Sequence, residues 1–140
     1  MSNKILVVED EESITELLKL CLEAEGHLVV ATDRGKTAIE WIKEIHVDLA
    51  IVDLGLPDIN GFEVCRHIKD NPKTRSIPII ILTGNTSNSA KIEGNMEANA
   101  DLFLNKPISI DDLKKAVTMM FEKAAKKKLL LRNSLKTRFD

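Results

Sequence analysis

The sequence lacks the features that mark disulfide-rich, metal-cluster or membrane proteins. Its two cysteines, Cys21 and Cys65, have no metal-ligand spacing and form no disulfide framework, so a reducing cytoplasm is the expected location. No apolar run approaches the ~20 residues that a membrane span needs. The N-terminus turns acidic directly after a short apolar run, unlike a signal peptide. There is no internal repeat and no low-complexity linker.

A strong net charge is also missing, but the charge is unevenly distributed. The 20 basic and 22 acidic residues give a net charge of −2, which argues against a protein that coats nucleic acid. The last 20 residues hold seven basic residues and two acids, so they carry +5 and residues 1–120 carry −7. With 140 residues the chain has the size of one ordinary domain. We expect an acidic domain over residues 1–122 and a basic, helical extension or linker over 123–140.

Short, almost unbroken apolar runs predict strands that are buried on both faces. Such runs are typical of parallel sheets covered by helices on each side. The three clearest runs lie at 5–8, 49–52 and 77–82, and two weaker candidates lie at 27–32 and 101–105.

Helical patterns alternate with these runs. The clearest begins at Ile14, with Ser13 and Glu16 as a capping box and Gly26 as a stop signal. The last helix follows Ser109, which can cap it. Further helices are predicted at 36–45, 61–70 and 87–97, the last of these being the most polar and the least stable.

Five strands alternating with five helices imply an α/β fold with right-handed crossovers. Five strands fit the flavodoxin-like, doubly wound parallel sheet of order 2-1-3-4-5 better than the six-stranded dinucleotide-binding order. In such sheets ligands bind outside the carboxyl ends of the strands. The residues that follow the strands should therefore decide the function.

Charged and hydroxyl residues follow four of the expected strands. Glu9 and Asp10, Asp53, Thr83 and Lys106 should all meet at one edge of the sheet. Crowded carboxylates repel one another unless a cation lies among them, and oxygen ligands favour a hard ion such as Mg²⁺. A lysine and a threonine hydroxyl beside that ion suit phosphoryl transfer, in which an aspartate can act as the nucleophile.

These motifs together resemble the receiver domain of two-component response regulators. The resemblance covers about residues 3–122 and includes every strand except the second. The matching stretches are ILVVEDEESI (5–14), DLAIVDLGLPDINGFEV (48–64), IPIIILTGNTS (77–87) and ADLFLNKPIS (100–109).

The resemblance implies an acceptor and a set of metal ligands. Asp53 would be the phosphoacceptor, and Glu9 and Asp10 would be the acidic pair that holds Mg²⁺. The backbone carbonyl of Gly55 would be a further ligand. Glu9 stands where many receivers have aspartate, and its longer side chain would reach the metal directly or through water.

The resemblance also implies groups that respond to the phosphoryl group. Lys106 would pair with the phosphoryl oxygens, and Thr83 would donate its hydroxyl and move toward them. Phe103 would be the aromatic switch residue that turns inward when Thr83 moves. Structural roles would fall to Pro57, Gly61 and Pro107, the last usually preceded by a cis peptide in this family.

The implied function is a phosphorylation-dependent signalling switch. The donor would be a sensor histidine kinase or a histidine phosphotransfer protein, and the surface from residue 83 to the last helix would regulate a partner or effector. The receiver itself would not bind nucleic acid. A homodimer could form through the helix at 87–97, the strand at 101–105 and the last helix, or through the C-terminal extension.

Three alternatives compete with this function. A degenerate receiver would act as an unphosphorylated interaction module, although Asp53, Thr83 and Lys106 are all present. An aspartate-nucleophile phosphatase of the haloacid dehalogenase kind would need a second acid where Gly55 stands. A flavin carrier would need a phosphate-binding loop where the chain has the anionic run 9–12. We therefore expect no enzyme beyond self-catalysed phosphorylation and dephosphorylation.

Overall fold

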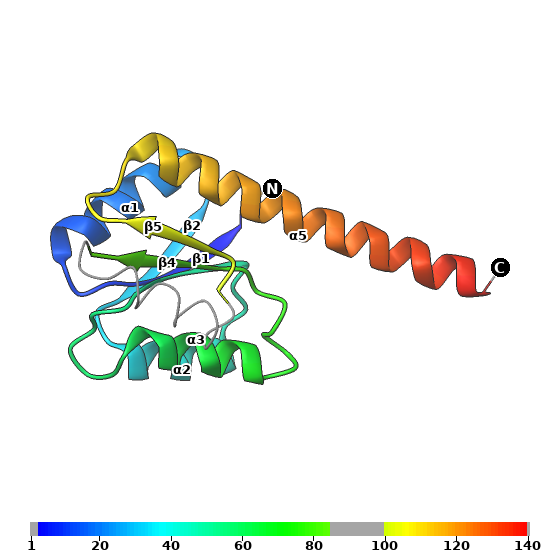
Figure 1. Cartoon of the computed structure of the whole chain (residues 1–140), viewed down its shortest axis with the longest axis horizontal. Helices are drawn as coiled ribbons and strands as arrows, with labels where there is room; N and C mark the ends of the chain where they lie inside the picture. The colour runs from blue at the N-terminus through cyan, green and yellow to red at the C-terminus, as the bar shows by residue number, and fades with distance from the viewer. Residues whose placement is uncertain (1–2, 85–99, 140) are drawn as a thin grey trace.

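The computed structural model describes residues 3–84 and 100–139 and consists of one parallel sheet between two layers of helices (Figure 1). The strands are β1 (Lys4–Val8), β2 (Leu28–Thr32), β3 (Leu49–Asp53), β4 (Ile79–Thr83) and β5 (Leu102–Asn105). The helices are α1 (Glu12–Ala24), α2 (Gly35–Glu44), α3 (Gly61–Asp70) and α5 (Ile110–Phe139). The helix predicted at 87–97 lies outside the described residues.

The strand order β2-β1-β3-β4-β5 confirms the predicted flavodoxin-like topology. Every neighbouring pair is parallel, and the register aligns Val8 with Val52 and Thr83 with Asn105. Helices α1 and α5 cover one face of the sheet, and α2 and α3 cover the other (Figure 1). The residues that follow β1, β3, β4 and β5 therefore come together at one edge.

The apolar runs form strands because both faces of the sheet are covered. Every residue of β3 and β4 is buried. Side chains alternate along each strand, so that Leu6 and Val8 face α2 and α3 while Ile5 and Val7 face α1 and α5. This burial fixes the register, since a shift by one residue would exchange the two faces.

The capping box predicted at Ser13 and Glu16 is wrong. Helix α1 begins one residue before Ser13, and its N-cap is Glu11, whose backbone oxygen accepts the N–H groups of Ile14 and Thr15. The N-cap residue is held by a residue that precedes the helix, because Glu9 Oε2 accepts the N–H of Glu11 at 2.9 Å. The other two signals are confirmed. Gly26 follows the helix at φ +90°, and the Ser109 hydroxyl accepts the N–H of Asp112 at 3.3 Å.

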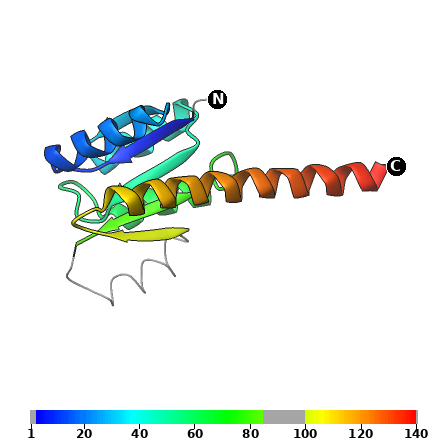
Figure 2. The same cartoon turned by 90° about the horizontal axis from the view of Figure 1, so that it is seen from above.

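Helix α5 continues without a break from the body of the molecule into the basic segment. Its first part packs on the sheet through Leu113, Val117 and Met120, which are buried. Its second part projects away from the other elements in both views (Figures 1 and 2). There the side chains of Leu129, Leu130 and Leu131 are more than half exposed. Within the described residues, no helix combines the length and the apolar character needed to cross a membrane.

Candidate functional site

Three carboxylates meet where β1 and β3 end. Glu9 and Asp10 follow β1, and Asp53 is the last residue of the adjacent β3. One carboxylate oxygen from each residue lies within 4.8 Å of the others. Glu9 and Asp53 are buried, whereas Asp10 is exposed. The parallel register thus gathers acids that are more than 40 residues apart in the sequence.

Lys106 brings a positive charge to this cluster from the end of β5. Its Nζ lies 2.9 Å from Glu9 Oε1, 3.4 Å from Asp53 Oδ2 and 3.3 Å from Glu11 Oε1. Its backbone N–H donates to the carbonyl oxygen of Thr83 at 2.8 Å, which continues the β4–β5 pairing. The Lys106–Pro107 peptide is cis, as the resemblance implied.

The electrostatics of the cluster favour the protonated forms of its buried acids. Burial raises the pKa of Glu9 to about 7, with a further contribution from the charge of Asp53, although Lys106 and the N–H of Glu11 oppose the shift. Burial also raises the pKa of Asp53. Burial disfavours the charge on Lys106, but its contacts with Glu9 and Asp53 outweigh this, so its pKa is raised. A single lysine does not balance three neighbouring carboxylates.

The donor set of this cluster fits a hard divalent cation. The Glu9 side chain has no exposed surface, and Lys106 Nζ lies 2.9 Å from its Oε1. This one lysine is shared with Asp53 and Glu11, so the buried carboxylates stay costly unless a further cation approaches them. All the side-chain donors are oxygens, which is the chemistry that Mg²⁺ prefers.

Thr83 and Gly55 lie beside Asp53 on neighbouring segments. Thr83 is buried at the end of β4, and its hydroxyl donates to the carbonyl oxygen of Gly84 at 3.0 Å. The N–H of Gly55 donates to Asp53 Oδ1 at 3.3 Å. A Cβ atom at Gly55 would meet no atom within 4 Å, so this part of the loop is open.

The remaining predicted residues lie around the acids. A Cβ atom at Gly61 would collide with the carbonyl oxygen of Asp53, so α3 starts directly against the backbone of Asp53. Pro57 is exposed in the loop between β3 and α3. Phe103 is half-buried on β5 and packs on the core face covered by α2 and α3, which leaves its switch role a prediction.

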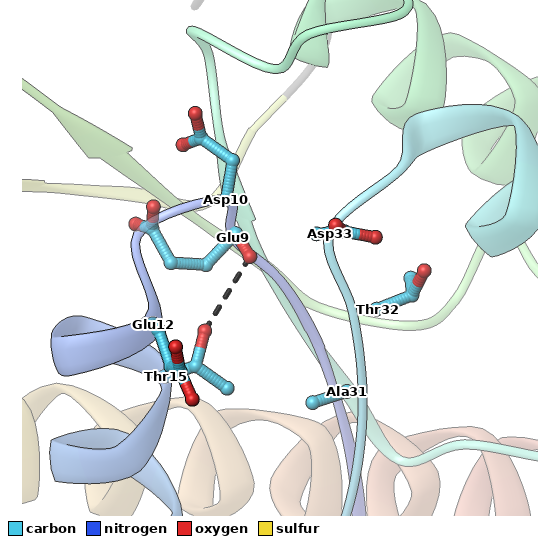
Figure 3. A pocket seen from close by; sticks show the side chains of 7 residues that line it. All are labelled: Glu9, Asp10, Glu12, Thr15, Ala31, Thr32 and Asp33. Atoms are coloured by element: carbon cyan, nitrogen blue, oxygen red, sulfur yellow. Dashed lines mark hydrogen bonds between the residues drawn. The ribbon is translucent and has the colours of Figure 1, made fainter.

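Two hollows flank the cluster. The first, of about 280 Å³, lies between the start of α1 and the end of β2 and is lined by acids and threonines (Figure 3). In it the Thr15 hydroxyl donates to the backbone oxygen of Glu9 at 3.4 Å (Figure 3). The second, of about 620 Å³, is next to Lys106 and is lined by apolar side chains of Ile14, Leu17 and Pro107.

Sequence analysis missed three residues that shape the site. Glu11 pairs with Lys106, 95 residues away, and no local pattern signals this contact. Asn60 caps α3 by accepting the N–H of Phe62 at 2.9 Å, which an asparagine before Gly61 could have indicated. Asp58 contacts the start of α2 through its carboxylate.

The fold and the acidic edge agree with a family assignment from comparison with known proteins. The profile of the response regulator receiver domain matches residues 5–118. The chain therefore belongs to the receiver domains of response regulators, the regulatory phosphoacceptor domains of two-component signalling.

Relatives of this chain are longer proteins. It is 40% identical over 124 residues to the phosphate regulon transcriptional regulatory protein PhoB of Rhizobium meliloti, covering 89% of this chain and 54% of PhoB. It is 39% identical over 108 residues to the response regulator PleD of Caulobacter vibrioides, covering 77% of this chain and 24% of PleD. The chain thus spans about half the length of PhoB and a smaller share of PleD.

Solved receiver structures share the fold along most of their length. A response regulator from Chloroflexus aurantiacus superposes with a TM-score of 0.81 at 32% identity, covering 86% of this chain and 98% of that one. The receiver domain of the sensor histidine kinase PA1611 from Pseudomonas aeruginosa superposes with a TM-score of 0.78 at 25% identity, with the same coverage. That domain holds a magnesium ion coordinated in its active-site cleft.

Proposed function

We propose that this chain is a phosphorylation-dependent switch that accepts a phosphoryl group on Asp53. The donor is the phosphohistidine of a sensor histidine kinase or of a histidine phosphotransfer protein. One observation carries the proposal: Asp53 lies among Glu9, Asp10 and Lys106 at the carboxyl edge of a receiver fold. This combination supplies a nucleophile, oxygen ligands and a cationic donor in one place.

The transfer forms one bond and breaks one bond. A carboxylate oxygen of Asp53 attacks phosphorus, and the bond between phosphorus and the histidine nitrogen breaks. The leaving nitrogen keeps the electron pair and takes a proton from solvent. Lys106 Nζ, already 3.4 Å from Asp53 Oδ2, donates to a phosphoryl oxygen, and the Thr83 hydroxyl leaves Gly84 to donate to another.

The same acids hold the magnesium ion that the reaction needs. Glu9, Asp10, Asp53 and the backbone carbonyl of Gly55 are the proposed protein ligands. When bound, the ion neutralises the charge that builds up on the transferring group. The close approach of the three carboxylates supports this assignment, because one oxygen from each already lies within 4.8 Å of the others.

The phosphoryl group then shifts an equilibrium between two states of the output surface. Thr83 and Phe103 lie on adjacent strands β4 and β5, so movement of the threonine is transmitted to the aromatic ring. The surface from the end of β4 to α5 would regulate an effector or partner protein. Both PhoB and PleD are much longer than this chain, which leaves room for an effector in each of them.

The apolar hollow beside Lys106 offers a docking place for the phosphoryl donor. Ile14 and Leu17 of α1 and Pro107 line it next to the acidic cluster. A partner helix seated there would hold its phosphohistidine near Asp53. Exposed apolar surface at the rim of a charged site suits transient recognition by another protein.

Mass spectrometry of the intact protein tests the proposal. After incubation with acetyl phosphate and Mg²⁺, the wild-type chain should gain one phosphoryl group, and the Asp53→Asn variant should gain none. The gain should also disappear when EDTA removes the metal. A folded wild-type chain that gains no phosphate would instead support the degenerate interaction module.

A further inference from the structure

The loop between β3 and α3 carries Gly55, and its far end is fixed to the backbone of Asp53. The N–H of Gly61 donates to the carbonyl oxygen of Leu54 at 3.1 Å, which closes the loop. Gly61 also lies so close to Asp53 that no Cβ atom fits between them. Asn60 caps α3 directly before this contact. The two ends of the loop are therefore set by β3 and α3.

The middle of the loop is fixed to a different helix. Asp58 Oδ1 accepts the N–H of Gly35 at 2.9 Å, and Asp58 Oδ2 accepts the N–H of Lys36 at 2.9 Å. These are the first two N–H groups of α2, which have no partner within their own helix. The N-cap residue Arg34 provides no side-chain cap, so Asp58 caps α2 from 22 to 23 residues away.

Charge and packing make this attachment specific. Burial opposes the charge of Asp58, but the N–H groups of Lys36 and Gly35 together outweigh it and lower its pKa, so the carboxylate is ionised at neutral pH. A negative charge is favourable at a helix N-terminus. The next residue, Ile59, packs so tightly on Gly35 that a Cβ atom there would lie 2.5 Å from Ile59 Cγ1.

Gly55 itself has little to hold it. Its Cβ position is open, and its N–H depends on the same Asp53 carboxylate that is to accept the phosphoryl group. Only two residues separate Gly55 from Asp58, and one of them, Pro57, has a fixed φ. The attachment of Asp58 to α2 therefore restricts where the carbonyl of Gly55 can lie.

We infer that Asp58 is a positioning residue that sets the affinity of the site for Mg²⁺ by holding the Gly55 loop against the start of α2. This inference rests on the proposed function, because it takes the carbonyl of Gly55 as a metal ligand. Asp58 does not touch the metal or the phosphoryl group. By its contact with α2, Asp58 keeps the carbonyl of Gly55 in place before the ion binds. The loop then loses less conformational entropy when Mg²⁺ binds.

The test compares Asp58→Ala and Asp58→Asn with a matched control, Asn71→Ala. Asn71 Oδ1 accepts the N–H of Lys73 at 2.9 Å after α3, so its loss removes a similar side-chain contact away from the acceptor loop. For each chain the Mg²⁺ dissociation constant is measured by calorimetry. The rate of labelling by acetyl phosphate is then measured as a function of Mg²⁺ concentration.

Asp58→Ala should weaken Mg²⁺ binding by about tenfold, the lower end of the effect of residues that orient metal ligands. Its labelling should be slow at low Mg²⁺ and return to within about twofold of the wild-type rate at saturating Mg²⁺. Asp58→Asn keeps one acceptor oxygen and should show a smaller shift in the same direction. Asn71→Ala should lower the unfolding midpoint without changing the Mg²⁺ dependence.

Two results would overturn the inference. One is an Asp58→Ala chain that binds Mg²⁺ as tightly as the wild type. The other is an equal shift in Asn71→Ala, which would make the effect one of general stability. Failure of the proposed function looks different, because the wild-type chain would then show no labelling of Asp53 at any Mg²⁺ concentration.

Discussion

At the scale of single residues, the buried carboxylates of the acidic cluster reduce the stability of the fold. Glu9 and Asp53 are buried beside each other with only Lys106 as a close cation among the described residues. Burial raises the pKa of both acids, and the charge of Asp53 adds to the shift of Glu9. These two proposed metal ligands thus oppose folding when no metal is bound and both are ionised.

The stability of the metal-free chain should therefore fall as the pH rises. The pKa of Glu9 is raised from 4.5 to about 7 in the folded chain, so the native state binds the extra proton between these values. The stabilisation of the folded chain by this proton on Glu9 is fully present below pH 4.5 and is lost as the pH rises through about 7. The raised pKa of Asp53 acts in the same direction. The loss from Glu9 alone should be about 3 kcal/mol, because one pKa unit corresponds to ~1.4 kcal/mol, and Asp53 should add to it.

Urea unfolding in EDTA at a series of pH values between 5 and 8 measures this effect. The Glu9→Gln variant should show a flatter dependence, since its side chain does not titrate. Excess Mg²⁺ should also flatten the wild-type curve above pH 7, because the ion then stabilises the ionised acids. Equal slopes in the wild type and in Glu9→Gln would show that Glu9 is not responsible.

At the scale of elements, β3 and α3 meet in a close backbone contact beside the site. Gly61 begins α3 against the backbone of Asp53 and Leu54. Alanine at the start of an exposed helix would normally raise stability by up to ~1 kcal/mol relative to glycine. Here the added methyl group would have to displace the backbone of the acceptor residue.

Gly61→Ala should therefore lower the free energy of unfolding by about 2 kcal/mol or more. It should also slow labelling of Asp53 by acetyl phosphate at saturating Mg²⁺, because the acceptor oxygen moves. For stability, Gly55→Ala is the matched control, since a Cβ atom there meets no neighbour within 4 Å. Thermal unfolding of both variants and the labelling rate of Gly61→Ala test this. Equal stability losses in the two would contradict the proposed role of the junction.

The elements themselves were largely predictable from the sequence. The runs around Ile51 and Ile80 are apolar because both faces of their strands are covered, so composition alone identified them. The start of α1 was predicted wrongly because the helix begins at Glu12 with Glu11 as its N-cap, and Glu9, a residue outside the helix, accepts the N–H of that N-cap residue. The observed ends of β4 differ from the predicted ones by one or two residues, because the strand begins after Pro78.

The residues of the site that stand at strand ends could be predicted from the sequence. The side-chain contacts between residues of different elements could not. Parallel topology brings Asp53 and Lys106 to one edge whatever the loops do. The contacts of Glu11 with Lys106 and of Asp58 with Gly35 depend on loop paths. No periodicity in the sequence encodes such paths, so these residues emerge only from the structure.

At the scale of the whole molecule, α5 joins two regions of opposite charge. Its first part belongs to the core through Leu113 and Met120, whereas the leucines of its second part, Leu129 to Leu131, are more than half exposed. Burial of apolar surface is what makes a helix contribute to stability, at about 25 cal/mol per Å². The exposed part contributes little to the fold of an isolated chain and is available for a partner or for a second copy.

A chain shortened to residues 1–125 should therefore keep its fold and its chemistry. This version retains the ion pair of Lys123 with Asp101 and every buried residue of α5. Its unfolding free energy at low protein concentration should lie within about 0.5 kcal/mol of the full chain, as for changes away from buried contacts. Labelling of Asp53 by acetyl phosphate should proceed at the same rate.

If the basic segment pairs two copies, light scattering of the full chain will give a mass that rises with concentration, and the shortened chain will remain a monomer. A large stability loss on shortening at low concentration would instead mean that the exposed leucines pack on the receiver in solution, and the division near residue 122 would have to be abandoned.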